Sequence, residues 1–307
     1  MRIAVIGAGG IGALLGASLA AAGQDVHFVA RGAHLAAMRA DGLRITGDRG
    51  DALVRPVQAT DEPETIGPVD LILFCVKLWD VETVGERIRP LLGAGTAVIP
   101  LQNGIDASER LLPILGAAHV LGGVAVLTGA IVAPGVVRQS GTHHRITFGE
   151  LDGRHSARAE RIQATFQQAG IETTLSDDIN RSRWEKFILL VAGSSLCSVT
   201  RRPIGELRDD PDIAPLFEEA MQEVVAVGRA CGIRFAANVL DPLRAFLRGV
   251  PPDWIPSMTV DLRAGNRLEL PWLAGRVVQL GVTHGVPTPV NRVIYAALKP
   301  YVLGAPK

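Results

Sequence analysis

The sequence lacks several features that would direct it to particular classes of protein. Its 31 lysines and arginines balance its 31 aspartates and glutamates, so no excess of positive charge points to a nucleic acid or an anionic membrane. Aromatic residues make up only 5% of the chain, too few for a surface on which bases stack. No run reaches the roughly 18 uninterrupted apolar residues of a membrane-spanning helix. We therefore expect neither nucleic acid nor membrane as a partner.

The chain is also poor in cysteine and shows no pattern of metal ligands. Cys75, Cys197 and Cys231 lie far apart in apolar runs and form no CxxC pair. We expect buried, reduced thiols in a cytoplasmic protein. His143 and His144 are adjacent and point in different directions, so we predict no metal site. The opening MRIAVIGAGG has too short an apolar run for a signal peptide.

A glycine-rich motif predicts a dinucleotide site. A β-branched strand at 2–6 is followed by GAGGIG, a small-residue helix and a second strand, DVHFVA. Gly7-x-Gly9-x-x-Gly12 in this context permits a tight turn, a close approach of the backbone to a pyrophosphate, and close packing of helix on strand. The helix N-terminus adds free N–H groups. The expected cofactor contacts are Gly7, Ala8, Gly9, Gly10, Ile11 and Gly12; the alternative is a glycine-rich turn without a ligand.

The end of the second strand indicates which dinucleotide binds. NAD-binding versions of this arrangement place an acidic residue there, which accepts hydrogen bonds from the ribose hydroxyls. This chain has Ala30 and Arg31 instead. A guanidinium matches a 2′-phosphate in both charge and geometry. We therefore predict NADP (as NADPH) rather than NAD, with a solvated loop arginine as the alternative.

The rest of the first half alternates strands with helices. Strands are expected at 69–77, 96–104 and 120–127, with helical segments such as 80–93 between them. This alternation predicts an α/β fold with a doubly wound, Rossmann-like parallel sheet. Short β-type runs between 128 and 150 are expected to be antiparallel strands that finish that sheet. A helix at 156–170 and a last strand at 171–176 follow.

Two polar residues end predicted strands. Lys77 and Asn103 each follow an apolar run, and the carboxyl ends of parallel strands face the ligand crevice. We expect Lys77 near the mouth of this crevice. Asn103 can donate and accept hydrogen bonds, although Asn-Gly is also a common plain turn.

The second half is predicted to be an all-helical domain. Strand signals stop after residue 176, so we place a cofactor domain at 1–176 and a helical substrate domain at 177–307. In RWEKFILLVAGSS, 183–195, Lys186 heads a helical stripe that is otherwise apolar or small. Such a lysine either extends to water or is held partly desolvated for a purpose. Because ligand sites favour clefts between domains, we interpret Lys186 as a proton donor beside a hydride-transfer site.

Six motifs together resemble one enzyme family. They are GAGGIGALLG, FCVK, LQNG, RWEK, SM…D at 257–261 and LE…G…HGVPTPVN at 268–291. In order and spacing they are similar to ketopantoate reductase (2-dehydropantoate 2-reductase) over nearly the whole chain. The resemblance implies NADPH-dependent reduction of 2-dehydropantoate to pantoate in pantothenate biosynthesis.

The same resemblance implies residue roles. Lys186 is the general acid, Asn103 holds cofactor or substrate near the nicotinamide, and Ser257 hydrogen-bonds the substrate. Glu269 binds substrate or orients Lys186, and Lys77 lines the cofactor side. Negative charge that builds on the ketone oxygen suits a nearby ammonium group.

The chain departs from the family at some positions. Leu190 and Ser194 stand where the family typically has asparagines, one and two turns beyond Lys186. Pro271 biases Leu270 away from helical geometry, so Glu269 should lie at or before a helix start. Alternatives are therefore reduction of another, more apolar 2-oxo acid, a non-catalytic NADP-binding sensor, or a dehydrogenase of a sugar or amino-acid derivative.

Two further questions stay open in the sequence. A carboxylate substrate needs more donors than Ser257 supplies, and Arg181, Arg183 and Arg263 are candidates. The apolar helical half is compatible with a homodimer.

Overall fold

The computed structural model describes residues 1–305, which form two compact units. The first consists of Met1–Gln102 and Asp106–Ser182, and the second of Asn103–Ile105 and the chain from Arg183 onward. The division therefore falls after Ser182, inside helix α6 (Ile179–Thr200), whereas we placed a boundary after residue 176. Because α6 continues through this point, no change in amino-acid composition marks the division in the sequence.

The first unit is built on a five-stranded parallel sheet with the order β5-β2-β1-β6-β7. The predicted α/β, Rossmann-like class is confirmed. Its central strand β1 is buried from Ile3 to Ile6, as expected for a strand covered on both faces. The strands are β1 (Arg2–Ile6), β2 (Asp25–Val29), β5 (Gln58–Thr60), β6 (Val69–Phe74) and β7 (Leu92–Pro100). The helices that accompany them are α1 (Gly10–Ala21), α2 (Gly32–Asp41), η1 (Pro63–Thr65), η2 (Leu78–Asp80), α3 (Val81–Arg87), η3 (Arg89–Leu91) and α4 (Ala107–Leu115).

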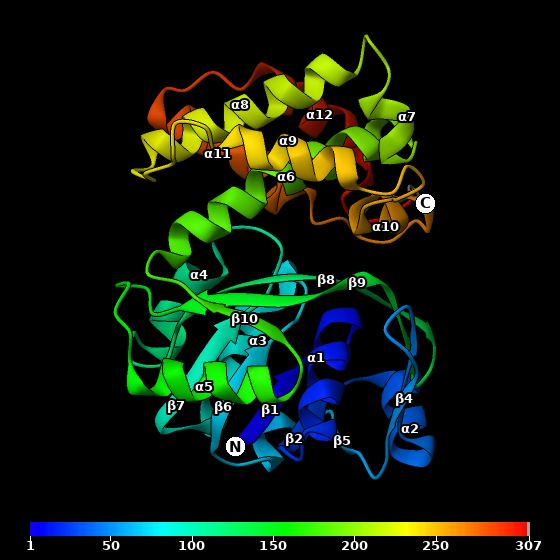
Figure 1. Ribbon diagram of the computed structural model, residues 1–307, viewed down its shortest axis with the longest axis vertical. Coiled ribbons are helices and arrows are strands. Elements are labelled where there is room, and N and C mark those ends of the chain that lie inside the picture. The colour runs from blue at the N-terminus through cyan, green and yellow to red at the C-terminus, as the bar shows by residue number, and fades with distance from the viewer. Residues whose placement is uncertain (306–307) are drawn as a thin grey trace. The chain divides into compact units, whose positions relative to one another are not determined.

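The protein has a second sheet, so one expectation about the later strands was wrong. The strands between 120 and 149 do not finish the first sheet; only Val120 bridges to it, at Val98. Instead β8 and β9 form a long antiparallel hairpin (Figure 1), and β9 pairs in parallel with β3 and β10. The elements are β3 (Leu43–Gly47), β4 (Ala52–Val54), β8 (Gly122–Ala133), β9 (Val136–Gly149), α5 (Ala157–Gln168) and β10 (Glu172–Leu175). Alternating hydrophobicity predicts a strand but does not identify its partner.

The hairpin packs directly on the helix that follows the glycine motif. A Cβ atom added to Gly10, the first residue of α1, would lie 1.9 Å from the carbonyl oxygen of Gly129 on β8. Two backbones can approach this closely only because both positions are glycine. The second sheet thus covers α1, and the two sheets share one apolar core.

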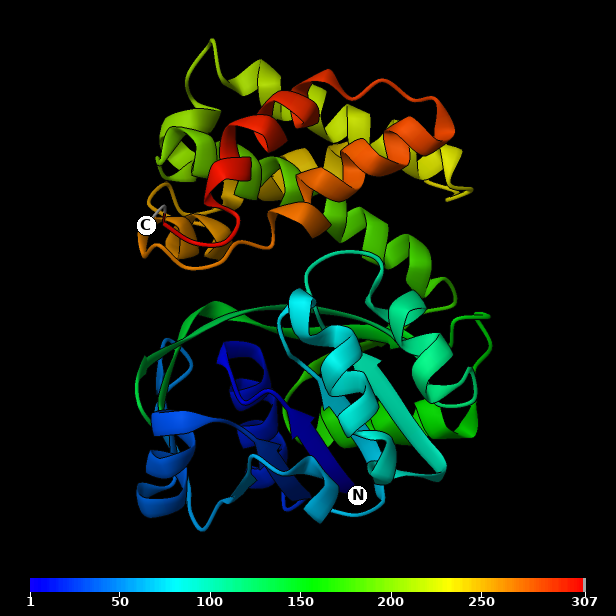
Figure 2. The same ribbon diagram turned by 180° about the vertical axis from the view of Figure 1, so that it is seen from behind.

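Within residues 183–305 the regular elements of the second unit are all helices, as predicted. After α6 it contains α7 (Ile204–Arg208), α8 (Ala214–Ala230), α9 (Leu240–Gly249), α10 (Ser257–Arg263), η4 (Leu270–Trp272), α11 (Ala274–His284), α12 (Pro289–Leu298) and η5 (Lys299–Tyr301). Helices α11, orange, and α12, red, lie side by side (Figure 2). The buried carboxylate of Glu223 on α8 accepts hydrogen bonds from the N–H groups of Val290 (2.7 Å) and Asn291 (3.0 Å), and so caps α12.

Candidate functional site

The turn after β1 has the shape of an anion cradle. Gly7 has a φ of +97°, and a Cβ atom there would lie 3.0 Å from the backbone of Cys75. A Cβ atom on Gly12 would lie 2.2 Å from the carbonyl oxygen of Gly7, whereas one on Gly9 would meet no atom within 4 Å. The first turn of α1 contains no acidic residue, and its N–H groups have no partners within the helix. The turn is therefore open at Gly9 and fits the pyrophosphate of a dinucleotide.

Arg31 and Lys77 lie at strand ends in the same unit. Arg31 is the N-cap residue of α2, directly after β2, and its side chain is 65% exposed. Its guanidinium forms an ion pair with Asp80. Lys77 is exposed after β6, and its Nζ lies 5.6 Å from the centroid of the Trp79 ring. The exposed guanidinium of Arg31 is accessible to a phosphate.

Lys186 is held by two side chains of the second unit. Its Nζ donates a hydrogen bond to Oδ1 of Asn103 at 3.0 Å. Burial lowers the pKa of Lys186 to about 8, although the charge of Glu269 opposes the shift. Glu269 itself is only 7% exposed. Lys186 is therefore an ammonium group at neutral pH that releases its proton more readily than a surface lysine does.

Asn103 and Gly104 form a turn that also carries a hydrogen-bonding side chain. Gly104 has a φ of +113°, so the pair does form a turn, and the same turn presents Asn103 to Lys186. Gln102 fixes the start of this segment, because its Nε2 donates to the carbonyls of Phe74 (2.9 Å) and Val76 (3.1 Å). Gln102 was not among the residues predicted from the sequence. Its only signal was its position between an apolar strand and the turn.

The arginines considered for the substrate carboxylate all have structural partners. Arg183 is buried and donates to the carbonyl of Ile105, so it fastens the Asn103–Ile105 segment to α6. Arg181 forms an ion pair with Asp177 at 3.6 Å, and Arg263 donates to a carbonyl just after α6 at 2.6 Å. Arg183 thus positions the residue that holds Lys186.

Ser257 lies on a helix, α10, that is hydrogen-bonded to the helix of Lys186. Ser257 is the exposed first residue of α10. Two residues later, the buried hydroxyl of Thr259 makes a 3.0 Å hydrogen bond with Ser198 of α6, the helix that carries Lys186. Glu269 directly precedes η4, as Pro271 predicted. The structure therefore brings Lys186 together with Asn103 and Glu269. Ser257 lies on α10, which is hydrogen-bonded to α6 through Thr259.

The face of α6 beyond Lys186 is less polar than the family pattern. Leu190, one turn further on, is partly buried, and Ser194 is 2% exposed. Leu190 packs against the apolar core of the second unit.

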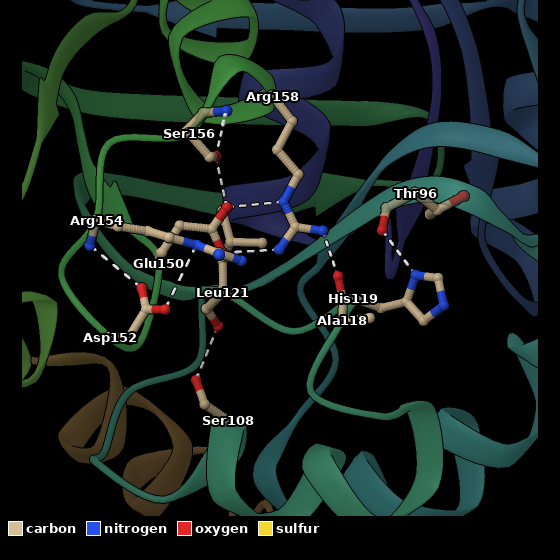
Figure 3. Close-up of polar contacts among 11 residues, drawn as sticks. Thr96, Ser108, Ala118, His119, Leu121, Glu150, Asp152, Arg154, Ser156 and Arg158 are labelled. Carbon is tan, nitrogen blue, oxygen red and sulfur yellow. Dashed lines mark hydrogen bonds and ion pairs between the residues drawn. The ribbon is translucent and has the colours of Figure 1, made fainter.

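A second buried charged cluster lies in the first unit and has a structural role (Figure 3). Glu150, 4% exposed, accepts hydrogen bonds from Ser156 Oγ (2.6 Å) and from Nε and Nη2 of Arg158 (2.7 Å each). Burial opposes ionisation, but the bonds from Arg158 and Ser156 hold the pKa of Glu150 below its usual value. Arg158 also donates to the carbonyl of Ala118. Because both oxygens of Glu150 are engaged, the cluster ties β9 to α5 and offers no acid or base.

The described residues, 1–305, contain no group of three or more His, Cys, Asp and Glu side chains that could hold a metal ion. Cys75, Cys197 and Cys231 form no disulfide; Cys197 is buried as expected, whereas Cys75 and Cys231 are only partly buried. Within the same residues no helix has the length and apolarity needed to cross a membrane.

Comparisons with known proteins agree with this geometry. The family model "Ketopantoate reductase PanE/ApbA" matches residues 3–153, and the model of its C-terminal part matches residues 178–302. A 2-dehydropantoate 2-reductase of Halobacterium salinarum is 31% identical, with 96% of each chain covered.

Solved structures give the same result. A 2-dehydropantoate 2-reductase of Geobacter metallireducens is 32% identical and superposes with a TM-score of 0.92 over 98% of this chain and 99% of its own. A D-mandelate dehydrogenase bound to NADH and anilino(oxo)acetate superposes with a TM-score of 0.91 over 98% of each chain, at 21% identity. This last likeness concerns the fold alone.

Proposed function

The chain belongs to the ketopantoate reductase PanE/ApbA family of oxidoreductases acting on CH–OH groups, and we propose that it reduces 2-dehydropantoate to pantoate with NADPH, the reductive step of pantothenate biosynthesis. The observation that carries this proposal is the lysine of the second unit. Lys186 combines a hydrogen bond to Asn103 with a pKa lowered by burial to about 8. That combination suits a proton donor.

The preference for NADPH is supported by charge at the end of β2. Arg31 stands where an NAD-binding fold has an acidic residue, and its exposed guanidinium matches a 2′-phosphate. The backbone from Gly7 to Gly12 is proposed to hold the pyrophosphate, with Lys77 on the cofactor side.

When bound, the dinucleotide supplies a hydride to the ketone carbon of the substrate. Negative charge then develops on the ketone oxygen. The ammonium group of Lys186 stabilises this charge and donates the proton that completes the alcohol. Asn103 accepts from Lys186 and so orients its Nζ.

Glu269 and Ser257 are proposed to complete the substrate site. The carboxylate of Glu269 raises the pKa of Lys186 against the effect of burial, which keeps the lysine protonated at neutral pH. The exposed hydroxyl of Ser257 is suited to a hydrogen bond with the substrate.

The substrate is tested by following NADPH oxidation with 2-dehydropantoate and a small panel of other 2-oxo acids. Fastest turnover with 2-dehydropantoate is the expected result. Turnover with only another 2-oxo acid would support the second candidate, a reductase of a more apolar acid, which the partly buried Leu190 favours. NADPH binding without any oxidation would instead support a non-catalytic sensor.

The role of Lys186 is tested by Lys186→Ala. We expect turnover to fall about 100- to 10,000-fold, the contribution of a general acid, while NADPH binding persists. Lys299→Ala is the matched control, because Lys299 is an exposed lysine of the same unit. Unchanged turnover in Lys186→Ala would remove the lysine from the reaction.

A further inference from the structure

An ion pair in the first unit joins the segments that follow β2 and β6, the two strands that flank β1. Nη2 of Arg31 lies 4.0 Å from Oδ2 of Asp80. Arg31 follows β2 and Asp80 follows β6, and the strand between them is β1. Because the glycine turn begins where β1 ends, the pair lies at the same edge of the sheet as the proposed pyrophosphate site.

Asp80 is the more firmly placed member of the pair. Its side chain is 34% exposed, against 65% for Arg31. Its N–H donates to the carbonyl of Lys77 at 2.9 Å. The same short turn is held from α4, because Nη2 of Arg110 donates to the carbonyl of Leu78 at 2.7 Å.

Arg110 is itself fixed in place. Its Nε donates to Oε1 of Glu82 and its Nη2 donates to Oε2, each at 2.6 Å. Such a bidentate pair restricts the orientation of the guanidinium. The turn that carries Asp80 is therefore held in place from α4, and the Asp80 carboxylate is the less exposed member of the pair.

The two charges have opposite preferences for a cofactor. A guanidinium favours the 2′-phosphate of NADPH, whereas a carboxylate at such a place accepts from the ribose hydroxyl of NADH and repels a phosphate. Here the acidic residue is absent from the end of β2 but is supplied by the turn after β6. A phosphate paired with Arg31 must compete with Asp80 for the guanidinium.

We propose that Asp80 is a specificity-determining residue that weakens the preference of this protein for NADPH and allows it to bind NADH as well. This inference rests on the proposed dinucleotide site at Gly7–Gly12. Asp80 acts in two ways: it competes for Arg31, and its charge opposes a phosphate bound there.

Direct binding measurements test the proposal without any substrate. Dissociation constants for NADPH and NADH are measured by isothermal titration calorimetry for the natural protein, Asp80→Asn and Arg31→Ala. In Asp80→Asn we expect NADPH to bind about three- to tenfold more tightly, the range of a partly exposed charge interaction, with NADH binding unchanged or weaker. Because salt screens such charges, the gain should shrink in about 1 M salt.

Asp61→Asn is the matched control. Asp61 pairs with Arg39 at 3.7 Å, and Arg39 lies near the other end of the same helix α2. Removing this exposed charge should leave both dissociation constants unchanged, which separates a local effect of Asp80 from a change in net charge.

The remaining outcomes distinguish the two proposals. An unchanged or weaker affinity of Asp80→Asn for NADPH, with NADPH binding lost in Arg31→Ala, would overturn the role of Asp80 and leave the NADPH assignment standing. If neither Asp80→Asn nor Arg31→Ala alters the ratio of the two constants, the phosphate assignment to Arg31 fails, and the role of Asp80 fails with it.

Discussion

At the residue scale, the lysine on α6 owes its chemistry to its surroundings. Lys186 is an ordinary amine in the unfolded chain, and burial among the helices of the second unit lowers its pKa to about 8. Its ammonium group donates a hydrogen bond to Oδ1 of Asn103, and the charge of Glu269 opposes the lowering of its pKa. Its position heading an apolar stripe was visible in the sequence and the family resemblance implied Glu269 as a partner, but the hydrogen bond to Asn103 was not predicted.

The first prediction concerns pH. A proton donor must be protonated, so we expect kcat/KM for reduction to be level below pH 8 and to fall tenfold per pH unit above a pKa of about 8. Glu269→Gln removes the charge that raises the pKa of Lys186, so the fall should begin at a lower pH. The measurement is a pH–rate profile of both proteins. A Glu269→Gln profile displaced to higher pH would contradict this electrostatic account.

At the scale of elements, two glycines in the turn between β1 and α1 have different roles, one in folding and the other in the proposed binding of the cofactor. Gly12 is needed because its Cα packs against the carbonyl of Gly7, whereas Gly9 faces open space. The motif was recognised from the glycine spacing and from the strands and helix around it, because both requirements are local. The hairpin that packs on Gly10 was not foreseen, since its partner, Gly129, is far away in the sequence.

A pair of substitutions exploits this difference. Gly9→Ala should leave the thermal midpoint nearly unchanged, because the new methyl group meets no atom within 4 Å, but it should weaken NADPH binding by filling the cradle. Gly12→Ala should lower stability, by an overpacking cost of about 1–3 kcal/mol, because its Cβ would lie 2.2 Å from the Gly7 carbonyl oxygen. Thermal melts and cofactor titrations of both variants check this. Equal loss of stability in the two would show that Gly9 is a folding residue.

At the scale of the whole molecule, one helix belongs to both units. Helix α6 runs from Ile179 to Thr200, and the division falls after Ser182. Separate unfolding of either unit would have to break this helix, whose turns form cooperatively. We therefore expect the two units to unfold together.

Calorimetry tests this expectation. We predict a single transition, and NADPH at about 100 times its dissociation constant should add about 2.7 kcal/mol of stability and raise the midpoint by about 4 °C. Two transitions, of which only one moves with NADPH, would contradict the prediction. NADP-free protein at the same salt concentration is the reference.

The sequence by itself determined what depends on neighbours along the chain. The first strand, the glycine turn and the first helix follow from residues 2 to 21. The helical second half follows from the helical spacing of its apolar residues, and Pro271 predicts that Glu269 precedes a helix. The tertiary structure alone decided which distant groups meet. Asn103 reaches Lys186 across 83 residues, Asp80 meets Arg31, and β8 pairs with β9 outside the first sheet. Local propensity acts over a few residues, whereas pairing and charge contacts depend on how the whole chain packs.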